Sequence, residues 1–198
     1  LTGFFDSLAG RSDSTRPLTF GDLWGEPEND AIVASAPDRP GRQREVDLQV
    51  MTTAVSQQMC FAIPLRDNAG QFYYDRAEWA RLFPARVMLW LDAVSAIEDG
   101  GHPPQHGALG QLLRRLPPNR YLPVVVAVRM SLSFPVLLSA VPLYAHDFSL
   151  RKEGQPVPPP KRVWFSDGGI SSNMPLHFFD APLPGRPTFA IGLKGEHP

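Results

Sequence analysis

The prolines of this chain mark where its loops lie. There are 22 among 198 residues, about twice the usual share. Proline has no backbone N–H and ends regular structure, so each proline group indicates a loop between elements. The groups are Pro37 and Pro40, Pro103 and Pro104, Pro117 and Pro118, and Pro156 with Pro158, Pro159 and Pro160. Because they are spread along the chain, they indicate loops of a folded domain rather than a disordered tail.

The composition is that of a globular protein. The hydrophobic fraction is 43% and the charged fraction 20%, and the length suits a single domain over residues 1–198. The net charge of −1, with no long run of Lys or Arg, argues against nucleic acid or an anionic membrane as an electrostatic partner. Cys60 is the lone cysteine, which excludes an internal disulfide and favours a reducing, cytoplasmic location.

Neither the start of the chain nor its most apolar stretch indicates membrane targeting. The opening "LTGFFDSLAG" has no basic start and no initiating Met, so we expect it to come from the middle of a longer protein. The apolar window from Leu122 to Ala145 contains Arg129, three prolines and three serines, which argues against a membrane span. A buried strand followed by a short helix explains this window better.

Periodicity and capping residues predict the elements. Thr19 with Asp22, and Asp75 with Glu78, are capping-box pairs at helix starts. The predicted strands cover 46–55, 58–65, 121–128, 162–166 and 187–193. The predicted helices follow Pro84, span Leu109 to Leu116, and run over 135–140. Strands separated by helical or loop crossovers predict an α/β fold, with 121–128 as a parallel strand buried on both faces.

Asp-Gly-Gly occurs twice. Asp99-Gly100-Gly101 follows a periodic apolar helix and is expected to cap its C-terminal end. Asp167-Gly168-Gly169 instead follows a strand, where reacting groups gather in open α/β sheets. The tripeptide alone also fits a tight turn whose aspartate bonds its own backbone.

The two segments "VAVRMSLSFPVLLSAVPLY" and "VWFSDGGISSNMPLHFF" together resemble the patatin-like phospholipases. The similarity runs loosely from about residue 18 to 193 and is strongest over 122–176. Residues from separate motifs of that family occur here in the same order. They are Arg129, Ser131, Pro135, Asp167, Gly168, Gly169, Asn173 and Pro175.

The resemblance implies a patatin-like α/β/α sandwich with a mostly parallel central sheet, of which this chain is the C-terminal portion. It also implies acyl-ester hydrolysis by a serine–aspartate dyad, with Asp167 as general base and no cofactor. Gly168, Gly169, Asn173, Pro175 and Arg129 would support the motif, and we expect Arg129 to form a structural ion pair. An acyl lipid or phospholipid is the implied substrate, with peripheral membrane contact.

The nucleophile half of the dyad is missing from this sequence. Neither Gly-x-Ser-x-Gly nor the glycine-rich oxyanion run is present, and Ser131 and Ser133 match family positions that are not the nucleophile. Without that serine there is no acyl-enzyme route, so the chain alone is expected to be inactive. His177 needs no catalytic role.

Two interpretations therefore stay open: a portion of a patatin-like acyl hydrolase, and a non-catalytic module that keeps the fold for protein or lipid binding. A metal-dependent hydrolase is disfavoured, since no His, Asp or Glu cluster has ligand spacing. If upstream strands are missing, strand 121–128 would expose an unpaired edge, and self-association through that edge is expected.

Overall fold

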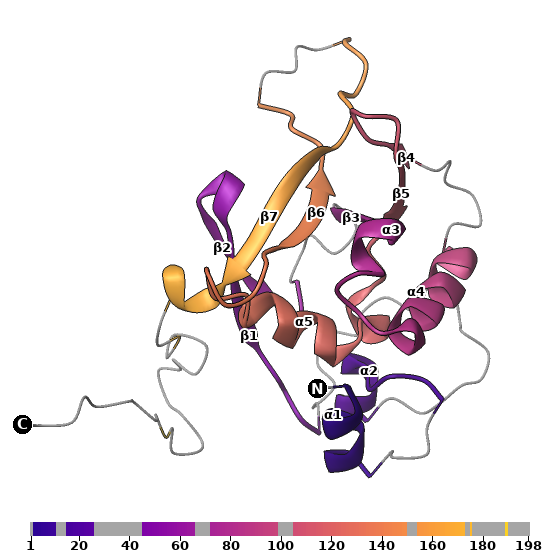
Figure 1. Cartoon of the computed structure of the whole chain (residues 1–198), viewed down its shortest axis with the longest axis vertical. Coiled ribbons are helices and arrows are strands. Elements are labelled where there is room, and N and C mark those ends of the chain that lie inside the picture. The colour runs from indigo at the N-terminus through magenta and orange to yellow at the C-terminus, as the bar shows by residue number, and fades with distance from the viewer. Residues whose placement is uncertain are drawn as a thin grey trace, which may run out of the picture.

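The computed structural model describes residues 2–10, 15–25, 45–65, 72–98, 105–149 and 154–172, together with Pro175 and Phe189. These residues contain a seven-stranded sheet in the order β2-β1-β7-β6-β3-β5-β4 (Figure 1). The strands are β1 (Val50–Ala54), β2 (Met59–Ile63), β3 (Phe72–Asp75), β4 (Gln105–His106), β5 (Leu112–Arg115), β6 (Val141–Ala145) and β7 (Lys161–Asp167). Every pair of neighbouring strands in this sheet is antiparallel.

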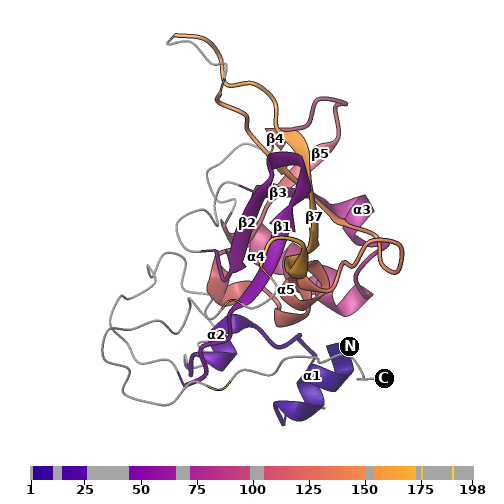
Figure 2. The same ribbon diagram turned by 90° about the vertical axis from the view of Figure 1, so that its left-hand side faces the viewer.

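Short helices accompany the sheet. The α-helices are α1 (Thr2–Leu8), α2 (Phe20–Leu23), α3 (Arg76–Trp79), α4 (Ala85–Glu98) and α5 (Val124–Ser131), and the 3₁₀ turns are η1 (Val55–Gln57), η3 (Asn119–Tyr121) and η4 (Gly168–Ile170). In Figures 1 and 2, α1 and α2 lie at one end of the molecule, far from the start of β7. Helix α5 packs against β1, β7 and η4, which brings it to the end of β7.

The expected α/β/α sandwich with a mostly parallel sheet is wrong, because the observed sheet is antiparallel. The error begins at 121–128, which was expected to be a central parallel strand and instead lies mostly in α5. Residues 124–127 are all apolar and all buried. Because no side of this run faces solvent, its sequence shows neither the helical nor the strand period of hydrophobic residues. Periodicity cannot separate a buried helix from a buried strand in so short a run.

Two predicted helices are also wrong. Residues 135–140 form a turn and an extended approach to β6, and the segment from Leu109 to Leu116 contains strand β5. Since 121–128 is not a strand, it cannot provide the unpaired edge expected there. The edges of the described sheet are β2 and β4, so self-association through an edge would use one of these strands.

Other local predictions are confirmed. The strands expected over 46–55 and 58–65 pair as β1 and β2, and 162–166 lies within β7. Thr19 and Asp22 form the complete capping box of α2. Asp75 caps α3 by accepting from the N–H groups of Ala77 and Glu78, but the return bond to the Glu78 side chain, expected of a capping box, is not observed there, so that prediction is only half confirmed. Helix α4 ends at Glu98, and Asp99-Gly100-Gly101 lies outside the described residues. The strand expected over 187–193 also lies outside them, except for Phe189.

Aromatic side chains pack across strands that are not direct neighbours in the sheet. Phe61, Phe72 and Phe165 lie within 5.6 Å of one another between ring centroids and link β2, β3 and β7. Trp79 is fully buried, and its indole N–H donates to the carbonyl oxygen of Pro142 over 2.8 Å. Burial of such rings stabilises the sheet by about 1.5–3 kcal/mol per side chain. This core fixes β7, whose last residue is Asp167.

Candidate active site around Asp167

Asp167 is the last residue of β7, the strand labelled in Figure 1, and η4 begins directly after it. The interior strands β1 and β7 are paired up to this point, since Thr52 is the register partner of Asp167. The chain then turns at once through Gly168–Ile170. The aspartate therefore lies at the carboxyl end of an interior strand, at the boundary between the sheet and a tight turn.

The backbone of Ser166 and Asp167 is held by hydrogen bonds from two other parts of the chain. The N–H of Asp167 donates to the carbonyl oxygen of Ser133 over 3.1 Å, and the Ser166 hydroxyl donates to the same oxygen over 2.8 Å. From β1, the hydroxyl of Thr52 donates to the Ser166 carbonyl and that of Thr53 to the Asp167 carbonyl, each over 2.8 Å. These groups fix the direction of the chain at Asp167 without using its side chain.

The carboxylate of Asp167 does not form the turn. It makes no capping hydrogen bond to η4. Within the part of the chain that the structure describes, it is half-exposed and takes part in no side-chain hydrogen bond or ion pair. A turn-forming aspartate normally accepts a hydrogen bond from the backbone one to three residues ahead. Among the described residues, this carboxylate therefore remains open to a hydrogen bond from another group.

Gly168 allows the turn to lie directly against β1. A Cβ atom at this position would stand 2.3 Å from the carbonyl oxygen of Met51 and 2.6 Å from its carbonyl carbon. Backbone atoms in a paired strand cannot move away cheaply, so glycine is required here by this close approach rather than by a positive φ. Gly169 follows it and is exposed.

Arg129 reaches the same region from α5. Its guanidinium donates to the hydroxyl of Ser133, and to the carbonyl oxygen and hydroxyl of Ser139 over 2.8 and 3.2 Å. Partial burial lowers the pKa of this guanidinium from its ordinary value. Among the described residues it contacts no carboxylate, so the expected ion pair is not observed. Its bonds instead connect the end of α5 to Ser133, whose carbonyl oxygen holds Asp167.

The remaining candidate residues are only partly placed. Ser131 ends α5 and is half-buried, and Pro135 lies in the exposed turn that follows it. Pro175 is half-buried, whereas Asn173 and His177 lie outside the described residues. Arg129 and Asp167 are thus linked through Ser133, which bonds both of them. The supporting role expected of Asn173 stays a prediction.

Sequence analysis missed the two threonines of β1 as site residues. Both are buried, and the Thr53 hydroxyl also lies 3.0 Å from that of Ser171. Adjacent threonines at the end of a buried strand were the available signal, because a buried hydroxyl must find a hydrogen-bond partner. The partners are the backbone carbonyl oxygens of Ser166 and Asp167, which belong to the two peptide groups that flank Asp167.

No metal site or membrane-spanning helix accompanies Asp167 in the described part of the chain. No group of three or more His, Cys, Asp or Glu residues there could hold a metal ion. None of the helices described is long and apolar enough to cross a bilayer.

The chain is similar to a known protein. A protein of Rhizobium meliloti (strain 1021) named RpoH suppressor is 36% identical over 222 aligned positions, covering 94% of this chain and 32% of the relative. The chain thus spans about a third of the length of the curated relative it matches. No protein-family model matches the chain. No solved structure is significantly similar to it.

Proposed function

We propose that this chain supplies the general base of a serine acyl hydrolase that resembles the patatin-like phospholipases. One observation carries this proposal: the Asp167 carboxylate is left without a hydrogen-bond partner among the described residues, although other groups fully determine its backbone. Sites that perform general-base catalysis need a carboxylate that is held in place and still able to accept a proton. A merely structural aspartate would be expected to bond the turn that follows it.

The proposed reaction uses a serine that this chain does not supply. The serine hydroxyl attacks the carbonyl carbon of an acyl ester, and Asp167 accepts the hydroxyl proton as the carbon–oxygen bond forms. Water then hydrolyses the acyl-enzyme and releases the acid. An acyl lipid or phospholipid is the proposed substrate, and a cytoplasmic location remains part of the proposal.

Two experiments test this function. The chain alone should not hydrolyse p-nitrophenyl butyrate above background, because it lacks the Gly-x-Ser-x-Gly nucleophile. A protein that joins this chain to a segment containing Gly-x-Ser-x-Gly should hydrolyse the ester only while Asp167 is intact. If the chain alone hydrolysed the ester and Asp167→Asn abolished that activity, the nucleophilic serine would have to lie within this chain. That result would contradict the proposal that another segment supplies the serine.

A non-catalytic binding module is the alternative. It is favoured by the fact that no Ser, Cys or His side chain bonds the Asp167 carboxylate in the described part of the chain. The alternative predicts that Asp167→Asn changes neither hydrolysis nor binding in any longer protein. The joined protein described above therefore distinguishes the two functions.

A further inference from the structure

Strand β2 is the longer of the two edge strands of the described sheet. It has five residues and pairs with β1 without a bulge, whereas the other edge strand, β4, has only two residues. Within the described residues, the backbone of β2 bonds no strand other than β1. An open edge presents unpaired backbone N–H and C=O groups, so a further strand can add to it.

The hydrogen bonds of β7 show which way the backbone of β1 points. In an antiparallel sheet, successive residues of an interior strand direct their N–H and C=O groups alternately to the two neighbouring strands. The N–H of Trp164 donates over 3.2 Å to the hydroxyl of Ser56, just past β1, so Trp164 and Ser166 direct their backbone groups to the β1 side. Ser166 is the register partner of Thr53. Thr53 therefore directs its own backbone groups to β7 and away from β2.

The same alternation identifies the residues that serve the open edge of β2. Cys60 is the register partner of Thr53, so its N–H and C=O groups point away from β1. Ala62, two residues further along, points the same way. Cys60 is exposed and Ala62 is half-buried. The outer edge of β2 thus offers the backbone groups of these two residues to another strand.

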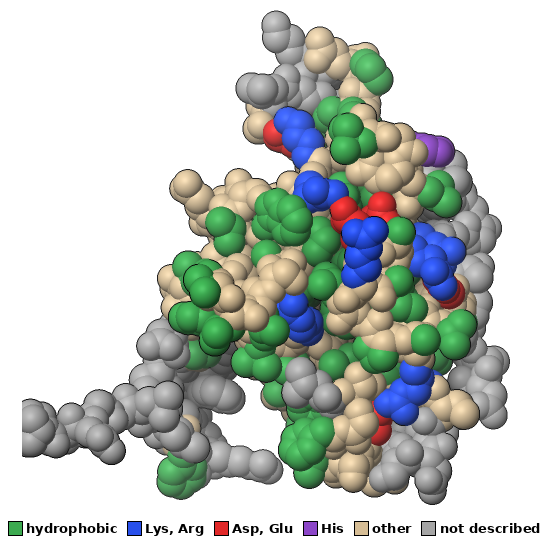
Figure 3. Space-filling view, viewed as in Figure 1, with side chains coloured by type: hydrophobic (Ala, Val, Ile, Leu, Met, Phe, Trp, Pro, Cys, Tyr) green, Lys and Arg blue, Asp and Glu red, His purple; other side chains and the backbone are tan. Residues whose placement is uncertain are grey.

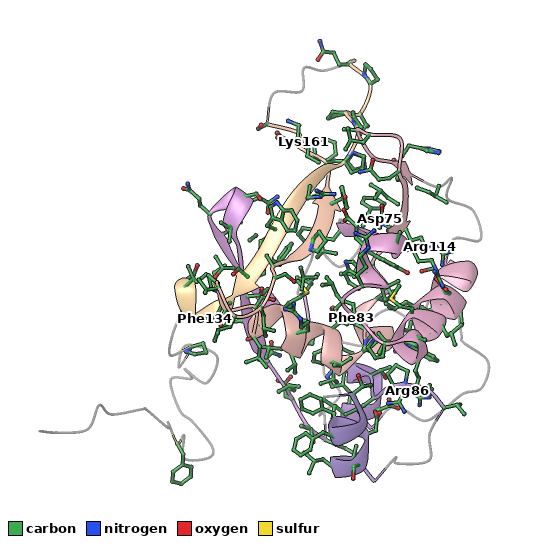
Figure 4. All side chains as sticks on the ribbon, viewed as in Figure 1. Asp75, Phe83, Arg86, Arg114, Phe134 and Lys161 are labelled. Atoms are coloured by element: carbon green, nitrogen blue, oxygen red, sulfur yellow. The ribbon has the colours of Figure 1, made fainter. Side chains whose placement is uncertain are left out.

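The edge of β2 has none of the usual protections against pairing. Natural proteins block such edges with charged side chains, a proline inside the strand or a bulge. Residues 48–65 include no charged side chain and no histidine. Figure 3 shows no Lys, Arg, Asp or Glu side chain on the side of the molecule where Figure 1 places β2. Asp75 and Arg114, labelled in Figure 4, lie on the other side of β7.

We propose that β2 pairs with the β2 strand of a second copy of this chain. A twofold axis makes the two strands antiparallel, which is how every neighbouring pair in this sheet is arranged. Phe61 lies opposite Phe61 of the second copy, and Cys60 lies opposite its Ala62, so the outward groups of both strands bond each other. An uncharged strand places no like charges opposite its own copy, which makes it self-complementary.

Sedimentation of the 198-residue chain over a range of concentrations tests this pairing. We expect a monomer–dimer equilibrium that added salt leaves unchanged, because the strand has no charged residue. Ala62→Pro should weaken the dimer by about tenfold, since it removes an outward N–H from both copies and a net hydrogen bond is worth about two- to tenfold. The bonds between β1 and β2 do not use this N–H. Ala62→Ser keeps it and is the matched control, with an expected change of about twofold or less.

A disulfide tests the register and keeps the proposal falsifiable if Ala62→Pro folds poorly. Ala62→Cys places a thiol directly opposite Cys60 of the second copy, with Cα atoms about 5.5 Å apart, which a disulfide can bridge. Mild oxidation should therefore link this variant into dimers. The unaltered chain should not be linked, because its two Cys60 residues lie diagonally, about 7–8 Å apart. Leu109→Cys, at an exposed position between β4 and β5, is the control and should not link either.

Several results would overturn the proposal. They are a monomer at every concentration, equal dimerisation of the proline and serine variants, and equal linking of Ala62→Cys and Leu109→Cys. Linking of the unaltered chain through Cys60 would contradict the register. If the chain alone were a dimer but the protein joined to a Gly-x-Ser-x-Gly segment were a monomer, the added segment would be the occupant of β2 instead. Asp167→Asn should leave the dimer unchanged, so the pairing and the proposed function can fail separately.

Discussion

The carbonyl oxygen of Ser133, just past α5, accepts the N–H of Asp167 at the end of β7 over 3.1 Å. The same oxygen also accepts a hydrogen bond from the Ser166 hydroxyl. One backbone group therefore orients two consecutive residues of the strand. The side chain of Ser133 in turn accepts from Arg129. The position of Asp167 therefore depends on α5 as well as on the sheet.

Arg129 should limit local opening of the backbone at Asp167. Arg129→Met removes the bonds to Ser133 and Ser139, so the segment that carries the Ser133 carbonyl should open more often. The Asp167 amide should then exchange its hydrogen with solvent about tenfold faster or more, as measured by NMR, since local opening governs such exchange. An amide distant from α5, such as that of Leu116, which donates to the Phe72 carbonyl oxygen, provides the control. Equal exchange at Asp167 in the two proteins would show that Arg129 has no part in holding it.

Thr53→Val should destabilise the chain, whereas Thr53→Ser should be nearly neutral. Valine preserves the shape of the buried side chain but leaves the Asp167 carbonyl oxygen without its side-chain donor. The loss is expected to be about 1–3 kcal/mol in the free energy of unfolding. Urea denaturation of the three proteins measures it. If valine and serine gave the same stability, the hydroxyl would contribute nothing.

Gly168→Ala should be among the more damaging single methyl additions in this chain. The added Cβ would meet the Met51 carbonyl oxygen at 2.3 Å, so β1 and η4 must separate. Overpacking of this kind costs about 1–3 kcal/mol. Gly3→Ala is the control, because nothing lies within 4 Å of its Cβ position in α1. Similar melting temperatures for both variants would disprove the close approach at Gly168.

Asp22 should make the chain sensitive to acid. Burial alone would raise the pKa of this carboxyl group, but hydrogen bonds from Arg16 and Thr19 outweigh it, and the pKa is lowered. A folded-state pKa below the unfolded one means that the stabilisation is fully present above the unfolded value, near pH 4, and is lost as the pH falls through the folded value. Asp22→Asn should lose about 1 kcal/mol at pH 7, a typical value for a capping interaction, and its stability should vary less with pH in the acid range. Parallel melting curves of both proteins from pH 7 to pH 3 measure this, and identical acid sensitivity would rule out Asp22 as its source.

Local signals in the sequence predicted local structure well. Thr19 and Asp22 form their capping box because both partners lie within four residues of each other. The strand expected over 162–166, just before Asp167 and two glycines, lies within β7, which includes Asp167 as its last residue. The sheet pairing was not accessible in this way, because the apolar run in α5 lacks periodicity and antiparallel partners lie far apart in the chain. The bonds from Thr52 and Thr53 to residues more than 100 positions away depend on that pairing.

The most direct test of the account is the turnover of Asp167→Asn in a protein that joins this chain to a Gly-x-Ser-x-Gly segment. Asparagine has nearly the same size but cannot act as a base, and the groups that hold the backbone at this position do not use the side chain. We expect kcat for ester hydrolysis to fall by about 10²–10⁴, the usual contribution of general-base catalysis, with the melting temperature unchanged. Full turnover in this variant would contradict a catalytic role for Asp167 and leave it as the residue that ends β7.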